Sequence, residues 1–242
     1  MQDIITALNA DPLDPDKVHL FIDGKHAITV TLDVAAAEML TVGQECPPAR
    51  LESLHQAEEL QTAYESAVRF LSYRPRSTRE VEMRLRKKSY TPEQIAGVVE
   101  RLRQRGYVDD MEFARFWVSN RMAFSPRGPR LLRSELRQKG VPQDVVDAVL
   151  QEQSEVQAEA EQQAEESAEL LGEGRDEPAP GTDLANALTL ARKKWRSYAN
   201  LDPQVARRRL SGFLMRRGYD YETVSGVLRR LLSPDDEDSP ED

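Results

Sequence analysis

Apolar residues recur at helical spacing through most of the chain, and short polar breaks separate one helical stretch from the next. The clearest stretch carries Ile95, Val98, Val99 and Leu102 at positions i, i+3, i+4 and i+7, which lie on one face of a helix. The sequence Thr-Pro-Glu-Gln from Thr91 is typical of a helix start, because proline fits the first helical position, where no N–H donor is needed. The pattern predicts a mainly α protein.

Nearly the same phrase occurs three times, beginning at Leu85, Leu136 and Leu214. Each copy has a basic helical end, a break and a new apolar helix: LRKKSYTPEQIAGVVERL, LRQKGVPQDVVDAVL and LMRRGYDYETVSGVLRRL. Each copy belongs to a unit of roughly 45 residues, a length that is typical of helical repeats, whose neighbours stack to complete their cores. We therefore expect an elongated array of three tandem three-helix repeats.

The first copy departs from the other two at its break. Ser89 occupies the position that Gly140 and Gly218 hold in the other copies. When Val145 is aligned with Ile95, the first copy also has one extra residue at this point. We therefore expect its turn to differ from the two glycine turns.

Residues 18–33 alternate apolar and polar side chains around Asp23-Gly24, and a helix is predicted at 49–72. An Asp-Gly pair favours a type I′ hairpin turn, because glycine accepts a positive φ without steric cost. The segment therefore predicts a small N-terminal β-hairpin extension. Since two strands alone are only marginally stable in water, the hairpin must pack against another part of the chain.

These elements suggest six segments along the chain. They are an N-terminal extension with the hairpin and a linking helix at 1–62, repeats at 63–108, 109–152 and 186–232, an acidic helical or flexible linker at 153–185, and a disordered acidic tail at 233–242.

Charge is sorted along the chain, so the total of -9 hides basic regions. Residues 1–65, 151–185 and 233–242 carry net charges of -9, -10 and -6, whereas residues 66–150 and 186–232 each carry +8. A polyanionic partner is therefore compatible with an acidic protein.

We find no arrangement of residues that predicts an enzyme. His19, His26 and His55 lack the spacing of zinc ligands, and no phosphate-binding loop or nucleophile motif is visible. The pair Asp109-Asp110 is explained better by a helix N-cap and a solvated neighbour than by a metal or acid–base site. No catalytic residue, metal or cofactor is therefore expected.

The cysteine count and the lack of long apolar runs indicate the cellular compartment. A single cysteine, Cys46, cannot form an internal disulfide and indicates a reducing compartment. The N-terminal sequence does not have the pattern of a secretory signal, and no apolar run approaches the ~20 residues that cross a bilayer. A cytoplasmic protein without membrane contact is expected.

The basic residues gather at the second helix of each repeat. Cations near a helix C-terminus stabilise the helix by about 0.3–1 kcal/mol each, so any single cluster is explained equally well as a solvated helix end. Three clusters at one place in three repeats instead indicate a basic surface that binds a phosphate backbone or an acidic protein groove. The predicted binding residues are Arg84, Arg86, Lys87, Lys88, Arg130, Arg133, Arg137, Lys139, Arg207, Arg208, Arg209, Arg216 and Arg217.

A second set of residues defines the structural motif of the repeats. Ser77 and Glu80 form a predicted capping box, and Gly106 is expected to take the left-handed conformation that ends a helix. Phe113 is expected in a core. The complete set is Ser77, Glu80, Gly106, Tyr107, Asp109, Asp110, Phe113, Gly140 and Gly218.

Four stretches resemble the RecX family, regulators of the RecA recombinase in bacteria. They are YRPRSTREVEMRLRKK, RGYVDDMEFARFWVSNR, GPRLLRSELRQKGVPQDVVDAVL and RRRLSGFLMRRGYDYETVSGVL. The likeness spans about Ala63–Leu232 and is interrupted by the acidic linker. The hairpin followed by LTVGQ is similar to an N-terminal extension of some members.

The resemblance implies a non-enzymatic negative regulator. Such a protein binds the RecA filament on single-stranded DNA in its helical groove and limits filament extension or promotes disassembly. ATP hydrolysis, strand exchange and co-protease activity of RecA fall as a result. The implied partners are the RecA filament, single-stranded DNA and, more weakly, double-stranded DNA, and we expect a monomer.

Two other functions stay open from the residues alone. The repeats could form an independent DNA-binding protein of tandem helix-turn-helix-like units, or a helical scaffold for another protein. The acidic linker and tail are either inert or compete with DNA for the basic surface.

Overall fold

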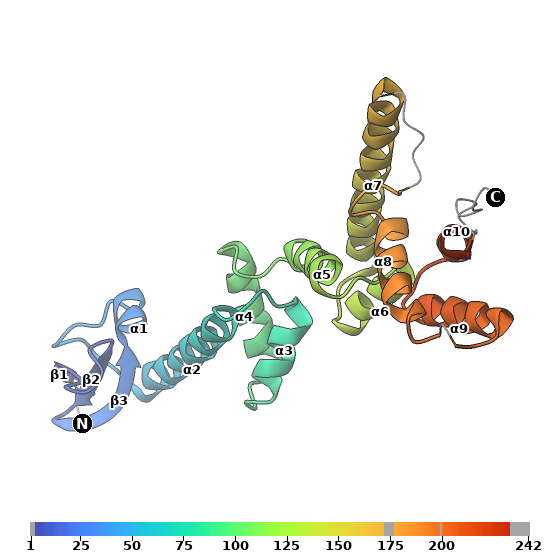
Figure 1. Ribbon diagram of the computed structural model, residues 1–242. Helices are drawn as coiled ribbons and strands as arrows, with labels where there is room; N and C mark the ends of the chain where they lie inside the picture. Colours follow the sequence, from blue (N-terminus) through green and yellow to red (C-terminus); the bar gives the residue numbers. More distant parts are fainter. Residues whose placement is uncertain (1–2, 172–176, 199, 233–242) are drawn as a thin grey trace, which may run out of the picture. The chain divides into compact units, whose positions relative to one another are not determined.

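The computed structural model describes residues 3–171, 177–198 and 200–232 (Figure 1). The chain divides into two compact units, Met1–Asp109 and Asp110–Asp242. The predicted mainly α class is confirmed, since the described residues form three-helix repeats and a small antiparallel sheet at the N-terminus. The predicted tail at 233–242 and part of the predicted linker, 172–176, lie outside the described residues.

The first unit begins with a three-stranded antiparallel sheet of β1 (Ile5–Ala10), β2 (Lys17–Ile22) and β3 (Lys25–Thr31), in that order. The predicted hairpin is β2–β3, and its turn has φ of 48° at Asp23 and 77° at Gly24, as a type I′ turn requires. The strand β1 was not predicted, because only Ile5 of its side chains is fully buried and its sequence shows no clear alternation.

The sheet packs on two helices, α1 (Leu32–Ala37) and α2 (Pro48–Leu71). The Glu58 carboxylate of α2 accepts hydrogen bonds from the backbone N–H and the hydroxyl of Thr31, at 2.7 and 3.2 Å. The buried Gln61 amide donates to Asp33 of α1 at 3.0 Å and accepts from Arg101 at 2.7 Å. The helix α2 therefore joins the sheet and the first repeat.

The first repeat consists of the C-terminal part of α2 with α3 (Thr78–Arg86) and α4 (Pro92–Gln104). The predicted capping box is confirmed: the N–H of Glu80 donates to the Ser77 hydroxyl, and the Glu80 carboxylate accepts from the Ser77 N–H. Gly106, with φ of 71°, ends α4 in the left-handed conformation as predicted. The exposed Tyr107 follows it and donates its N–H to the carbonyl of Leu102.

The second unit holds the other two repeats. The second repeat consists of α5 (Asp110–Phe124), α6 (Pro129–Gln138) and α7 (Gln143–Leu171), and the third of α8 (Asp183–Trp195), α9 (Pro203–Arg216) and α10 (Tyr221–Leu232). Asp109 immediately precedes α5, and Asp110 is its first residue. Phe113 is buried in the core of the second repeat as predicted.

The turn between the second and third helices has the same backbone in all three repeats. Ser89, Gly140 and Gly218 have φ of 67°, 79° and 92°, and the N–H of the following residue donates to the carbonyls of Leu85, Leu136 and Leu214, respectively. The expectation of a different turn at Ser89 was wrong. The residue buried at the place of Ile95 is Val146 in the second repeat, not Val145, so the first copy has no extra residue.

The second and third repeats join through two helix ends. The N–H groups of Gly128 and Arg130, at the start of α6, donate to the carbonyls of Arg217 and Gly218 beyond the end of α9, at 2.9 and 3.3 Å. The first N–H groups and the last carbonyls of helices have no partners within their own helix. The two helix ends therefore provide hydrogen-bond partners for each other. Gly128 and Gly218 have no side chain that would prevent this close approach.

The helix α7 continues into the acidic linker as far as Leu171 (Figure 1). Beyond the core residues Val149 and Leu150, it contacts the third repeat through Gln157. The amide of Gln157 donates to the Asp183 carboxylate at 3.4 Å and accepts from the Asp183 N–H at 3.2 Å. This stretch of the linker is therefore part of the folded second unit.

Candidate nucleic-acid interface

The four predicted cations of the first repeat, Arg84, Arg86, Lys87 and Lys88, are all exposed at the end of α3. They do not share one direction, because α3 turns by about 100° per residue and buries the face of Leu85. Lys87 lies opposite Leu85, whereas Arg84 and Arg86 lie on opposite flanks of the helix, about 100° to either side of Leu85.

The flank of α3 that carries Arg84 borders a groove of about 390 Å³ within the first unit. Arg84 and Lys88 line it together with Lys17 from β2 and Arg69 from α2. Sequence reasoning missed Lys17 and Arg69, because they come from elements that only the fold brings close to α3. Glu58 and Glu65 also line the groove, so its charge is mixed.

The helix α6 presents Arg130, Arg133 and Arg137 at positions i, i+3 and i+7, opposite its buried leucines. All three are exposed. Arg133 pairs with Asp147 of α7 at 3.0 Å, but both side chains are about half exposed, so the pair adds little stability. This face is the most regular basic surface of the second repeat.

Lys139 does not lie on that face. Its side chain is partly buried, and its ammonium lies 4.9 Å from the centre of the Trp117 ring. The Trp117 indole N–H donates to the Glu135 carboxylate at 2.8 Å, and the Arg121 guanidinium contacts the same carboxylate at 2.8 Å. Lys139 therefore belongs to the packing around Trp117.

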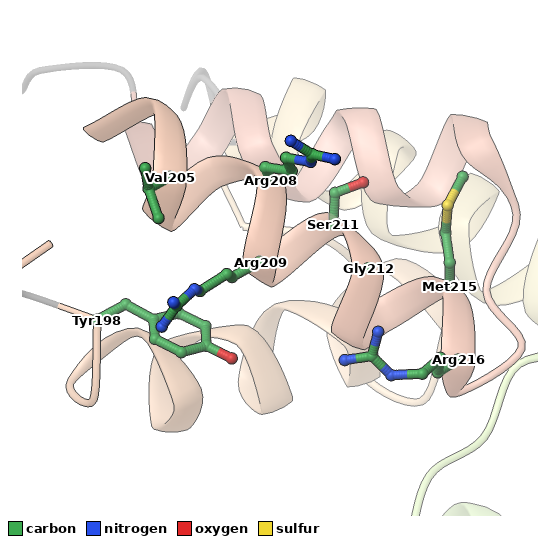
Figure 2. A pocket seen from close by; sticks show the side chains of 8 residues that line it. All are labelled: Tyr198, Val205, Arg208, Arg209, Ser211, Gly212, Met215 and Arg216. Atoms are coloured by element: carbon green, nitrogen blue, oxygen red, sulfur yellow. The ribbon is translucent and has the colours of Figure 1, made fainter. Parts of the chain in front are cut away.

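The helix α9 carries four exposed arginines, Arg207, Arg208, Arg209 and Arg216. Arg217 is partly buried, with its guanidinium 5.4 Å from the Phe213 ring. Three of the exposed arginines line an open pocket of about 740 Å³ on the outward side of α9 (Figure 2). Its lining residues are Tyr198, Val205, Arg208, Arg209, Ser211, Gly212, Met215 and Arg216.

One arginine position is common to all three repeats. Counting six residues back from the equivalent leucines Leu85, Leu136 and Leu214 gives Arg79, Arg130 and Arg208, respectively, and all three arginines are exposed. Arg130 and Arg208 were predicted and Arg79 was not, because Arg79 lies apart from the basic cluster at the end of α3. The repeated leucine would have located it.

Burial raises the pKa of two groups that lie away from the basic faces, the Asp183 carboxyl and the Cys46 thiol. Burial raises the pKa of the Asp183 carboxyl to about 6, and the charges of Asp220 and Glu161 act in the same direction, while the Gln157 hydrogen bond opposes them. Burial also raises the pKa of the Cys46 thiol, which lies in the core of the N-terminal sheet. A buried thiol with a raised pKa is a poor nucleophile.

Within the described ranges, the His, Cys, Asp and Glu residues form no group of three or more that could hold a metal ion. None of the helices in those ranges combines the length and the apolar character needed to cross a membrane.

Comparisons with known proteins agree with the repeat structure. Residues 63–110, 109–150 and 182–228 match family models described as the first, second and third three-helix domains of RecX, and these ranges together cover more than half of the chain.

Full-length relatives show the same likeness. "Regulatory protein RecX" of Bacillus pumilus is 26% identical over 238 residues, which is 98% of this chain and 81% of that protein. The protein of the same name from Bacillus subtilis is 28% identical over 235 residues, or 97% and 80% of the two chains. A solved structure described as regulatory protein RecX superposes with a TM-score of 0.75 at 20% identity, covering 93% of this chain and 98% of the other, and shows the same fold.

Proposed function

The chain belongs to the RecX family, and we propose that it is a negative regulator of RecA that binds the RecA filament on single-stranded DNA, in the filament's helical groove. It limits filament extension or promotes disassembly, and thereby lowers ATP hydrolysis, recombinase and co-protease activity of RecA. It performs no catalysis of its own, acts as a monomer in the cytoplasm, and binds double-stranded DNA more weakly than single-stranded DNA.

The observation that carries this proposal is the outward face of the second helix in each repeat. The helices α3, α6 and α9 bury apolar faces in their own cores and expose arginines on the opposite side. Such a face suits DNA phosphates or acidic grooves of a filament, and several weak contacts along one chain add to a useful affinity.

Independent sequence-specific DNA binding is supported less well. In helix-turn-helix proteins the recognition helix presents residues that read base edges from its N-terminal part. The third helices here expose carboxylates in that part, among them Glu93 of α4, Asp144 of α7 and Glu222 of α10. These charges repel a phosphate backbone.

RecA-catalysed ATP hydrolysis on single-stranded DNA, measured with increasing amounts of this protein, tests the proposal. We expect inhibition at substoichiometric amounts. The variant R130E/R137E should raise the concentration for half-inhibition at least fivefold, because it reverses two exposed charges on the basic face of α6. Lys139 stays unchanged in this variant, since it packs on Trp117.

The matched control is K25E/K193E, which makes the same change in net charge at exposed positions of β3 and α8. It should inhibit within twofold of the wild type. Absence of inhibition by the wild type would contradict the proposal, and a sequence-dependent gel shift of duplex DNA would favour the DNA-binding alternative. Equal losses in the two variants would show that only total charge matters.

A further inference from the structure

We propose that the pocket on the outward side of α9 is a binding site for single-stranded nucleic acid, in which arginines hold phosphates and a base stacks on Tyr198. The inference rests on the proposed function and adds to it the place of contact with DNA.

The pocket exists because two small residues lie in the middle of the outward face of α9. Ser211 and Gly212 occupy the places that Glu82 and Met83 hold in α3, and that Arg133 and Ser134 hold in α6. Figure 2 shows Tyr198, Val205 and Arg209 toward one end of these small residues, and Met215 and Arg216 toward the other. The volume of about 740 Å³ lies in the range of pockets that hold nucleotide-sized molecules.

The charged side chains that line the pocket are all positive. They are three arginines, Arg208, Arg209 and Arg216, and among the described lining residues none is acidic. In contrast, the groove beside α3 includes two glutamates, and the cavity beside α8 includes three glutamates and one arginine. The arginines extend over about 12 Å along the helix axis, which suits an extended ligand with repeated negative charge. Charge complementarity therefore selects a polyanion.

Tyr198 selects nucleic acid among polyanions. The residue follows α8, and two backbone hydrogen bonds hold its turn: the N–H of Tyr198 donates to Trp195 at 2.7 Å, and the N–H of Leu201 donates to Tyr198 at 3.0 Å. The ring is partly exposed at the pocket, and the Lys194 ammonium lies 5.4 Å from its centre. Stacking on aromatic rings beside cationic grooves is the usual way in which single strands bind without sequence preference. An acidic peptide would use the arginines but has no flat base for the ring.

The experiment measures fluorescence anisotropy of a labelled oligothymidylate of about 12 nucleotides, a usual site size, with the full chain and without RecA. The variant G212L fills the pocket without changing charge and should lower the affinity at least fivefold. Y198A should lower it 5- to 20-fold, and Y198F, which keeps the ring, should stay within twofold of the wild type.

The matched control is G97L, the same exchange at an exposed helical glycine of α4 that has nothing within 4 Å of an added Cβ. It should bind within twofold of the wild type, and circular dichroism melts should show that G212L and Y198A remain folded. Wild-type affinity in both G212L and Y198A, or no binding by the wild type, would overturn the inference. Equal competition by oligoglutamate and unlabelled oligothymidylate would also overturn it, because the pocket would then accept any polyanion.

The same proteins are measured for inhibition of RecA ATP hydrolysis. If the wild type inhibits RecA but the pocket variants bind the oligonucleotide normally, the pocket assignment alone fails. If the wild type does not inhibit RecA, the proposed function fails, whatever the oligonucleotide does.

Discussion

The turns that follow α3 and α9 have one backbone but different surroundings. Both end a helix with a left-handed residue, Ser89 with φ of 67° and Gly218 with φ of 92°. Ser89 is exposed to solvent, whereas Gly218 is buried against the start of α6. A Cβ on Gly218 would lie 2.5 Å from the backbone nitrogen and the Cβ of Leu131.

The difference separates two reasons for a glycine. A left-handed conformation alone disfavours other residues by about 1–2 kcal/mol, which a serine in solvent tolerates. A neighbouring backbone at contact distance excludes every side chain. The third repeat therefore needs its glycine because another repeat docks on it, and the exposed turn of the first repeat does not.

The largest expected effect is that of G218A. The variant combines an unfavourable φ with a clash against backbone that cannot move away, so we expect the free energy of unfolding of the second unit to fall by about 3–5 kcal/mol. Urea denaturation followed by circular dichroism measures the loss, and hydrogen exchange should show faster opening of α8–α10.

Two other glycines separate the contributions. G106A tests the cost of the left-handed backbone alone, since Gly106 has φ of 71° and open space around it. Its free energy of unfolding should fall by about 1 kcal/mol. G128A carries the steric cost alone: Gly128 has φ of −71°, and its Cβ would lie 2.4 Å from the Gly218 backbone. A loss in G218A no greater than in G106A would contradict docking as the reason for the glycine.

The sequence predicted the elements that local signals specify. Proline and capping residues locate the helix starts, the Asp-Gly pair locates the hairpin turn, and the repeated phrase locates the three repeats. It did not predict β1, whose strand is held by its pairing with β2 and by Ile5 in a core made by distant residues. It also misaligned Val145, because adjacent valines are equivalent in sequence and only burial distinguishes them.

The candidate interface was predicted in residue type but not in arrangement. Charge clusters were visible, yet the side of the helix on which each cation lies depends on which face is buried, and Lys139 therefore lies apart from Arg137. The pocket on α9 was not predicted, because small residues such as Ser211 and Gly212 carry no chemical signal and Tyr198 comes from a different helix connection. The contact between the second and third repeats was not predicted for the same reason, because Gly128 and Gly218, which allow it, carry no chemical signal in the sequence.

The second-largest expected effect concerns another contact between the second and third repeats, that of Gln157 with Asp183. Asp183 is held by Gln157 and faces Glu161, Asp220 and the buried Tyr219. Since its pKa is raised from 3.8 to about 6 in the folded protein, the folded state binds the extra proton between these values. Stability should therefore fall as pH rises from about 4 to 6, by about 2–3 kcal/mol.

The variant D183N removes this titration and keeps a side chain that hydrogen-bonds to Gln157. We expect it to unfold at higher urea than the wild type at pH 7, and the difference between the two proteins to vanish near pH 4. If the free energies of unfolding of the two proteins instead change in parallel from pH 4 to 7, the pKa of Asp183 is not raised at this contact.

The smallest effect completes the comparison of the two turns. S89G gives the first repeat the residue that the other two repeats have at this turn, at a position that is exposed to solvent. We expect a gain of about 0.5–1 kcal/mol in the free energy of unfolding of the first unit. Relief of the strain of a left-handed serine raises this free energy, and the greater freedom of glycine in the unfolded chain offsets part of the rise. Urea denaturation measures the gain, and a clear loss instead would mean that the Ser89 side chain stabilises this turn through contacts of its own.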